Sequence, residues 1–308
     1  MSAAPAAIPG PLARWVVGAR PRTLAAAAVP VVVGTAVGWW SRTGALAGAR
    51  LVAGPGAVLW WRAAMALVVE LAGQVGTNYA NDYSDGVRGT DQGRVGPLRL
   101  VASGAAAPGS VRLAALVCFG VAGVAGLALA AATTWWLVPV GAACFAAGWL
   151  YTGGPKPYGY LGLGEVFVFL FFGVVATVGS AYVQARSFDL WWACVPVGLL
   201  STALLEANNL RDIAGDAAAG KRTFAVRLGP RRARWLYVGS LAGVVAGVAG
   251  VAAVRPWALL ALGGLALALH PVRAVLRGAK GRELVAVLGR TGRMQLTVGA
   301  LLALGILL

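Results

Sequence analysis

The sequence predicts an all-α integral membrane protein with nine transmembrane helices. Of its 308 residues, 59% are hydrophobic and only 12% are charged, whereas a soluble domain carries about 25% charged residues. The 44 glycines are typical of membrane helices that pack closely, because small residues let two backbones approach. We expect residues 1–308 to form a single transmembrane domain, with residues 1–22 as a cytoplasmic N-terminal segment.

The helices are predicted from the lengths of the apolar segments. A spanning helix needs about 20 mainly apolar residues. Nine segments meet this requirement: 23–40, 63–83, 111–133, 135–151, 163–183, 190–210, 235–254, 257–276 and 294–308. A tight turn near Thr133 and Thr134 joins the third segment to the fourth. Tryptophans gather at the segment boundaries, as in the aromatic belts of membrane proteins; they are Trp39, Trp40, Trp60, Trp61, Trp135, Trp136, Trp191, Trp192 and Trp257.

The basic residues orient these segments in the cell membrane. Cytoplasmic loops of membrane proteins carry an excess of Lys and Arg. With the N-terminus inside, all but five of the 26 basic residues fall on the cytoplasmic side; the exceptions are Arg42, Arg50, Arg62, Arg186 and Arg255. We therefore expect a multi-pass protein whose N-terminus and acidic stretches face the cytoplasm and whose C-terminus lies outside.

The composition excludes other classes of protein. A net charge of +16 could indicate nucleic-acid binding, but the basic residues lie between apolar segments and form no soluble basic face. The single histidine and three scattered cysteines do not support a zinc site.

The carboxylates are concentrated in two stretches of the chain. NYANDYSDGVRGTD (78–91) and NNLRDIAGD (208–216) hold half of the ten acidic residues. Residues four apart share a face of an α-helix. The first stretch therefore extends a polar row made of Glu70, Gln74, Asn78 and Asp82, with Asn81 and Asp85 beside it, and the second stretch places Asn208, Asp212 and Asp216 in one row.

Two such rows at one membrane surface indicate a metal site. Opposed carboxylates repel each other unless cations lie between them, and Mg²⁺ is usually held by one or two carboxylates, waters and substrate phosphates. Basic residues that could meet the phosphates lie in the adjacent loops: Arg88, Arg94, Arg99, Lys156, Arg211, Lys221 and Arg222. This arrangement suits ionisation of an allylic diphosphate, with the carbocation held in an apolar chamber that excludes water.

Two carboxylates lie deeper in the predicted helices. Polar groups inside a bilayer are costly and normally face a cavity or a partner. Glu70 and Glu206 could each contact a substrate. They could equally be protonated carboxyls that form hydrogen bonds within the helix bundle.

Four stretches of the chain resemble the UbiA superfamily of intramembrane prenyltransferases. They are ARPRT (19–23), QVGTNYANDYSDGVRGTD (74–91), YTGGPKPYGYLGLGEVFVFLFFG (151–173) and NNLRDIAGDAAAGKRTFAVRLG (208–229). The resemblance implies a nine-helix horseshoe bundle around a central cavity, and dependence on Mg²⁺. The similarity is greatest to the branch that transfers a polyprenyl chain from polyprenyl diphosphate to 1,4-dihydroxy-2-naphthoate. That reaction releases CO₂ and diphosphate and gives demethylmenaquinone in menaquinone biosynthesis.

The resemblance also implies roles for individual residues. The implied metal ligands are Asn81, Asp85, Asp91, Asn208, Asp212 and Asp216, and the implied catalytic residues are Asp85, Asp212, Asp216 and Lys156. Substrate contacts would come from Asn78, Asp82, Lys156, Arg211, Lys221, Arg222 and Arg22. Arg22 is a candidate anchor for the anionic acceptor, although it could instead orient the first helix. One departure concerns Gly89, which stands where many members have the third Asp of the first motif, so that Asp91 lies two residues further on.

Two alternatives stay open from the sequence. Within the superfamily, the acceptor could be 4-hydroxybenzoate, homogentisate, or a chlorin or haem precursor. From another class, polar faces on membrane helices could line a cation transporter, although a cation pathway has no use for Lys156, Lys221 and Arg222 at its mouth.

Overall fold

A computed structural model describes residues 10–43, 58–91 and 98–308, and these residues form helices and loops without a strand. The first half of the chain contains α1 (Pro11–Gly18), η1 (Pro21–Thr23), α2 (Ala25–Arg42), α3 (Trp60–Arg88), α4 (Pro108–Ala132), α5 (Leu137–Leu150) and η2 (Tyr158–Leu161). Two basic residues considered above, Arg50 and Arg94, lie outside the described residues.

The second half of the chain is also helical. It contains α6 (Gly164–Val168), η3 (Phe169–Val178), α7 (Gly179–Ala185), η4 (Trp191–Ala193), α8 (Cys194–Ala218), α9 (Phe224–Ala252), η5 (Pro256–Leu259), α10 (Leu260–Gly264), η6 (Leu265–Ala268), α11 (Leu269–Leu276) and α12 (Arg282–Leu307). The elements α6, η3 and α7 follow one another without a break, as do η5, α10, η6 and α11. The predicted all-α architecture is confirmed for the described residues.

Each of the nine predicted segments falls on a helical element, but fewer helices qualify as spans by length and apolar composition. Four do so: Pro108–Ala132, Gly164–Ala185, Phe224–Ala252 and Pro256–Leu276. A fifth arises if Pro11–Thr23 and Ala25–Arg42, which are bent by 54°, form one span. Those outside this set include α3 and α8, which carry the two acidic stretches.

The predicted boundaries were wrong for three helices. Helix α8 continues to Ala218 and α9 begins at Phe224. Most of residues 211–234, which separate two of the predicted segments, are therefore helical, and the row from Asn208 to Asp216 lies on a helix. Helix α12 begins at Arg282 instead of near 294. Its first three turns carry arginines but bury Leu284, Val287 and Leu288, whose spacing of three and four residues is that of an amphipathic helix.

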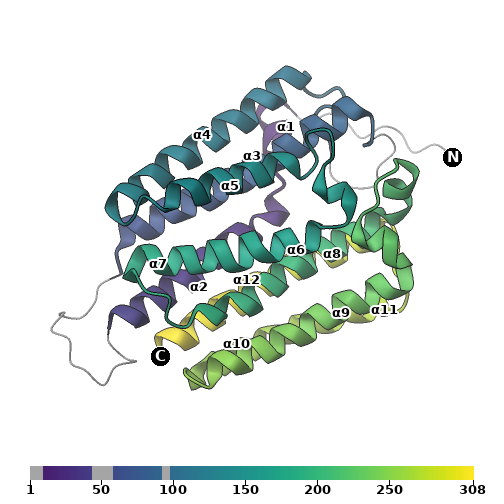
Figure 1. Cartoon of the computed structure of the whole chain (residues 1–308). Helices are drawn as coiled ribbons and strands as arrows, with labels where there is room; N and C mark the ends of the chain where they lie inside the picture. The colour runs from purple at the N-terminus through teal and green to yellow at the C-terminus, as the bar shows by residue number, and fades with distance from the viewer. Residues whose placement is uncertain (1–9, 44–57, 92–97) are drawn as a thin grey trace.

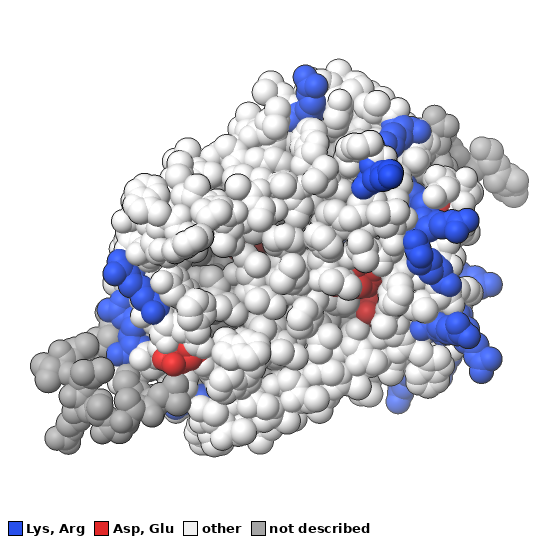
Figure 2. Space-filling view, viewed as in Figure 1, with Lys and Arg blue, Asp and Glu red and all other residues white. Residues whose placement is uncertain are grey.

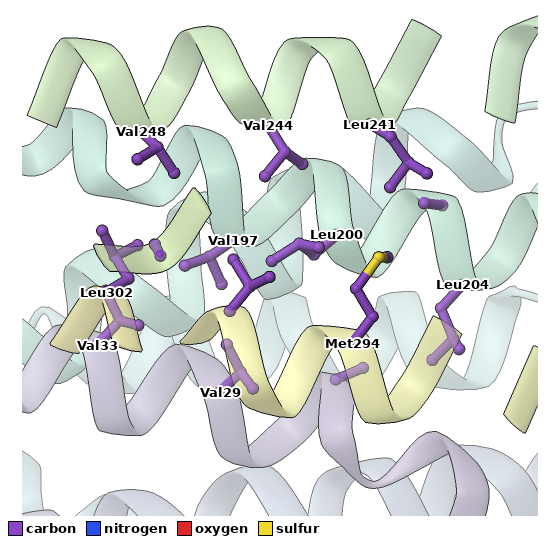
Figure 3. Packing of buried hydrophobic residues seen from close by; sticks show 14 of the residues in the cluster. Val29, Val33, Val197, Leu200, Leu204, Leu241, Val244, Val248, Met294 and Leu302 are labelled. Carbon is purple, nitrogen blue, oxygen red and sulfur yellow. The ribbon is translucent and has the colours of Figure 1, made fainter. Parts of the chain in front are cut away.

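The largest apolar core lies where α8 meets α9, α12 and α2. Figure 3 shows valine and leucine side chains of α9 directed toward those of α8, with α2 and α12 packed on the opposite side of α8. A second core joins α3 to α4 through Tyr79, Leu100 and Phe119. Figure 1 shows α3, α4 and α5 together on one side of the molecule and α8, α9 and α12 toward the other.

Helix α2 passes very close to η3 and α7 at Gly34. A Cβ atom at this position would lie 2.3 Å from the carbonyl oxygen of Thr177 and 2.6 Å from Cβ of Ser180. A glycine is therefore required for this helix contact, as is common between membrane helices.

The substitution Gly34→Leu is expected to force α2 away from η3 and destabilise the fold by about 3 kcal/mol, since overpacking a tight contact costs about 1–3 kcal/mol or more. Thermal unfolding in detergent measures this loss. Gly239→Leu is the matched control, because in the described chain nothing lies within 4 Å of a Cβ at Gly239. Equal melting temperatures for the two variants would contradict the prediction.

Arginines satisfy helix-end carbonyls at the end of the molecule where α4 and α7 stop. Helices leave their last carbonyl groups without partners. Arg62 donates to the carbonyl oxygens of Val183 (2.7 Å) and Ala132 (3.0 Å), and the oxygen of Ala132 also accepts from Arg186 (2.9 Å). Arg42 donates to the carbonyl oxygen of Gln184 at 3.2 Å. These arginines therefore tie the ends of four helices together.

The predicted aromatic belt is present in part. Trp60, Trp135 and Trp136 are exposed, whereas Trp40 is only 2% exposed, with the Arg255 guanidinium 5.8 Å from its ring centroid. On the face drawn in Figure 2, Lys and Arg gather mostly at the end where α8 runs into α9 and at the opposite end, and the wide band between these ends shows almost no Lys or Arg. Such a band is what a lipid bilayer requires.

Candidate active site

A cavity of about 1250 Å³ lies between α3, α4 and α5 on one side and η3, α8 and α12 on the other. Most of its wall is apolar, with Phe119, Phe171 and Val175 among the lining residues. Several of the polar residues that line it lie at the end of the molecule where the acidic stretches are, among them Arg20, Arg22, Asn78, Asn81, Arg99, Asn208, Arg211 and Arg282. Glu70 is the acidic residue among the described lining residues.

The first acidic stretch is held by the loops beside it. Asp85, which is 3% exposed, accepts hydrogen bonds from the Tyr160 hydroxyl at 2.5 Å and from Lys221 Nζ at 2.9 Å. Lys221 also lies 4.8 Å from the centroid of the Tyr160 ring. Burial, together with the Asp85 carboxylate, raises the pKa of the Tyr160 phenol, so that Tyr160 stays protonated and donates. One carboxylate thus joins α3, η2 and the loop after α8.

Other residues near the end of α3 contact the segment between α5 and η2 and the loop before α4. The Asn81 amide oxygen accepts a hydrogen bond from the Thr152 hydroxyl at 2.8 Å. Arg88 donates to the backbone oxygens of Thr152 and Gly154. Asp91 is buried and lies 3.3 Å from Nε of Arg99. The segment 151–157, which joins α5 to η2, therefore contacts the end of α3 that carries the first acidic stretch.

The second acidic stretch is organised by a neighbouring arginine. Arg211 binds Asp212 in a bidentate manner, with Nε–Oδ1 at 2.8 Å and a terminal nitrogen to Oδ2 at 2.7 Å. The same terminal nitrogen donates to the Asn208 amide oxygen at 2.8 Å. Asp212 is 5% exposed and Asp216 is also buried. Asn208 and Arg211 line the cavity, whereas Asp212 and Asp216 are not among its lining residues.

Two predicted substrate contacts are engaged in the fold. Both carboxylate oxygens of Asp82 accept hydrogen bonds from backbone N–H groups, those of Leu100 (2.9 Å) and Val101 (3.0 Å). The Asn78 amide nitrogen donates to the Ala19 carbonyl oxygen at 2.9 Å, although Asn78 still lines the cavity. Asp82 thus fixes the loop before α4, and Asn78 fixes the bend between α1 and α2.

The predicted basic residues occupy different positions. Arg211 and Arg22 line the cavity, and Lys221 is buried beside Asp85. Lys156 and Arg222 are exposed and are not among the residues that line the cavity. The backbone N–H of Arg222 donates to the Tyr160 carbonyl oxygen at 3.0 Å.

The deeper carboxylates differ from each other. Glu70 lines the cavity, as the substrate-contact interpretation requires. Glu206 is buried and accepts a hydrogen bond from the Ser240 hydroxyl at 2.8 Å, as the alternative interpretation requires. Glu165, which sequence reasoning missed, accepts from the Asn209 amide at 3.0 Å.

Sequence reasoning also missed Tyr160, Thr152 and Arg20. Tyr160 and Thr152 belong to the family-like stretch 151–173, in which Lys156 was the only residue selected as a site candidate. Arg20 donates to the Asn78 carbonyl oxygen at 3.3 Å and lines the cavity. Its place within ARPRT, directly before the first predicted segment, was the signal that could have found it.

The donor atoms at this end of the cavity fit a magnesium site. Mg²⁺ prefers oxygen ligands and completes its octahedron with waters and phosphates; carboxylate and amide oxygens of Asp85, Asp212, Asn81 and Asn208 are of this kind. Within the described residues, no three His, Cys, Asp or Glu side chains are grouped closely enough to hold a metal. A metal here would therefore combine one or two carboxylates with amide and phosphate oxygens.

The chain belongs to the UbiA prenyltransferase family, whose family model matches residues 41–286. The predicted family resemblance is thereby confirmed. Among curated proteins, the chain is 48% identical to the 1,4-dihydroxy-2-naphthoate octaprenyltransferase of Mycobacterium tuberculosis, over 96% of this chain and 97% of that protein. It is 34% identical to the enzyme of the same name from Escherichia coli, over 96% of this chain and 95% of that protein.

Solved structures share the fold at low sequence identity. A UbiA homolog from Aeropyrum pernix K1 superimposes with a TM-score of 0.65 at 16% identity, covering 91% of this chain and 96% of that one. A UbiA homolog from Archaeoglobus fulgidus, bound to GPP and Mg²⁺, gives a TM-score of 0.63 at 15% identity, covering 94% of this chain and 99% of that one.

Proposed function

We propose that the protein transfers a polyprenyl chain from polyprenyl diphosphate to 1,4-dihydroxy-2-naphthoate, in the pathway to menaquinone, and that it uses Mg²⁺. The observation that carries this proposal is the cavity, which joins a long apolar chamber to a polar end lined by Asn81, Asn208 and Arg211. An apolar chain and a diphosphate match these two parts. The naphthoate acceptor is supported by the named relatives at 48% and 34% identity.

Different residues of the chain would bind the diphosphate and stabilise the allylic cation. When bound, Mg²⁺ neutralises the diphosphate and stabilises the charge that develops as it leaves. Arg211 and Lys221, whose positive charges lie beside Asp212 and Asp85, are placed to meet diphosphate oxygens. The aromatic rings of Tyr158 and Phe167, stacked with centroids 4.0 Å apart, line the cavity. They exclude water and stabilise positive charge on the allylic carbon.

The bond changes balance without an external base. The carbon–oxygen bond to the diphosphate breaks, and the ring carbon that carries the carboxylate forms the new bond to the allylic carbon. The carbon–carboxylate bond then breaks, its electron pair restores the aromatic ring, and CO₂ leaves. The direct product is the hydroquinone form of demethylmenaquinone.

The proposal includes the topology and the predicted ligand set. Residues 1–308 form one domain of nine spans in the cell membrane, with residues 1–22 and the polar end of the cavity cytoplasmic and the C-terminus outside. The metal ligands are Asn81, Asp85, Asp91, Asn208, Asp212 and Asp216. Arginines of the polar end that are exposed or line a cavity support this orientation through the positive-inside rule; they include Arg20, Arg22, Arg99, Arg211, Arg222, Arg282 and Arg293. They also disfavour a cation pathway.

An activity assay tests the proposal. Purified protein in nanodiscs is incubated with polyprenyl diphosphate, Mg²⁺ and 1,4-dihydroxy-2-naphthoate, and the prenylated product and CO₂ are quantified. EDTA is expected to abolish product formation and added Mg²⁺ to restore it. Parallel reactions with 4-hydroxybenzoate and homogentisate test the acceptor. Product from one of these and none from the naphthoate would overturn the proposed acceptor.

A further inference from the structure

A second cavity opens beside the main one at the polar end. It has a volume of about 590 Å³, lies between η1, the start of α2 and the first turns of α12, and is lined by Arg22, Arg282, Arg290 and Arg293 among others. Small-molecule sites commonly have volumes of about 300–1,000 Å³. The cavity exists because α12 begins at Arg282, about three turns before the apolar part of the helix.

The charge of this second cavity is entirely positive. None of its described lining residues is acidic. Among the described residues, the ion pairs Arg99–Asp91, Arg211–Asp212 and Lys221–Asp85 do not involve these four arginines. The nearby carboxylate of Glu283 accepts the backbone N–H of Lys280 at 3.1 Å and does not line the cavity. Four like charges facing one space favour a bound anion.

The second cavity adjoins the main one. Pro21, Arg22, Arg282 and Val285 line both. Arg22 and Arg282 thus stand where the two cavities meet, and Asn208 and Arg211 line the same main cavity. An anionic group held between Arg22 and Arg282 would place an attached ring inside the main cavity, on the side that also carries the second acidic stretch.

We propose that Arg282, together with Arg22, binds the carboxylate of the aromatic acceptor, and that the second cavity is the route by which this acceptor enters from the aqueous side. The inference rests on the proposed function and adds to it an acceptor site and Arg282. The guanidinium fork matches a carboxylate, and the apolar ring suits the chamber beyond. Because the reaction removes the carboxylate as CO₂, the product loses this anchor and leaves toward the lipid.

The role of Arg282 as an anchor predicts a particular kinetic pattern. The interaction with the carboxylate exists in the bound substrate and is lost as CO₂ departs. Arg282→Gln is expected to raise KM for the naphthoate at least tenfold while kcat changes less than threefold. The carboxylate is still attached to the ring while the new carbon–carbon bond forms, so the interaction contributes equally to the bound substrate and to that transition state. KM for the polyprenyl diphosphate stays unchanged.

Competitive inhibitors test whether the arginines bind the carboxylate of the acceptor. 1-Hydroxy-2-naphthoate and its neutral amide differ only in the carboxylate. In the wild-type protein the acid is expected to inhibit at least tenfold more strongly than the amide, and in Arg282→Gln and in the Arg22→Gln/Arg282→Gln double variant this ratio falls toward one. Arg273→Gln is the matched control, since Arg273 is exposed on α11 and lines neither cavity; it should keep the wild-type ratio.

The outcomes separate this inference from the proposed function. An unchanged inhibitor ratio in the double variant, with activity on the naphthoate intact, overturns the acceptor site alone. Absence of naphthoate prenylation by the wild-type protein overturns the proposed function instead. Phosphatidylglycerol and phosphatidylcholine nanodiscs form a further arm: if Arg282→Gln abolishes a dependence on phosphatidylglycerol and leaves KM for the naphthoate unchanged, the cavity takes a lipid phosphate and the inference is wrong.

Discussion

Replacing Asp212 by asparagine is expected to lower kcat by roughly 100-fold or more. Asparagine keeps the shape of the side chain and one oxygen but removes the negative charge that a divalent cation requires. A metal contributes several kcal/mol of charge stabilisation to a reaction of this kind, and each 1.36 kcal/mol corresponds to about a tenfold change in rate. Product formation at saturating Mg²⁺ and both substrates measures the effect.

The control for this experiment is Asp189→Asn. Asp189 lies at the opposite end of the molecule, where its carboxylate accepts a hydrogen bond from Ser41 at 2.6 Å. This variant should keep activity within about twofold, since surface polar contacts contribute little. Full activity of Asp212→Asn at an unchanged Mg²⁺ requirement would remove Asp212 from the ligand set.

Lys221→Met is expected to lose activity and to lower the melting temperature in the absence of Mg²⁺. In the structure, Lys221 neutralises Asp85 in a buried ion pair at 2.9 Å. Removing one partner of a buried pair leaves the other charge uncompensated and costs about 3–5 kcal/mol. In EDTA the variant should therefore melt at a clearly lower temperature than the wild type. Mg²⁺ with an unreactive diphosphate analogue should narrow this difference, because the dication supplies the missing charge beside Asp85.

A double variant isolates the ion pair in this experiment. In Asp85→Asn/Lys221→Met no charge is left unpaired, so its melting temperature in EDTA should exceed that of Lys221→Met. Lys280→Met is a second control, because Lys280 is exposed and its side chain does not line the cavity. A stability of Lys221→Met equal to that of Lys280→Met in EDTA would contradict the prediction.

The helices and the polar rows could be predicted because both depend on local spacing. Each predicted apolar segment of about 20 residues falls on a helical part of the described chain, and the spacing of four residues placed Asn208, Asp212 and Asp216 on one helix. The start of α12 could not be found in this way. Residues 282–293 are not apolar enough to qualify as a span. Their amphipathic pattern can be assigned to a buried face only when the positions of α2 and α8 are known.

Contacts made by loops were beyond prediction for a different reason. The family resemblance implied a substrate contact for Asp82, but its orientation toward Leu100 and Val101 depends on how a loop returns to α3. The partners of Asp85 lie 75 and 136 positions away in the chain, and no local pattern specifies such pairs. For Lys156 the family-like stretch 151–173 implied a role in the site, but the folded chain leaves this residue exposed.

The few arginines at the end of the molecule opposite the acidic stretches all contact neighbouring parts of the fold. Arg42, Arg62 and Arg186 donate to helix-end carbonyls, and Arg255 stacks on Trp40. Each described exception to the positive-inside pattern is thus committed to a neighbour within the fold. In the proposed orientation these charges would oppose insertion before their neighbours are assembled, and the folded protein would hold them in place through these contacts. Substitutions at Ala132 or Val183 that displace these carbonyls would weaken the contacts without altering a single charge.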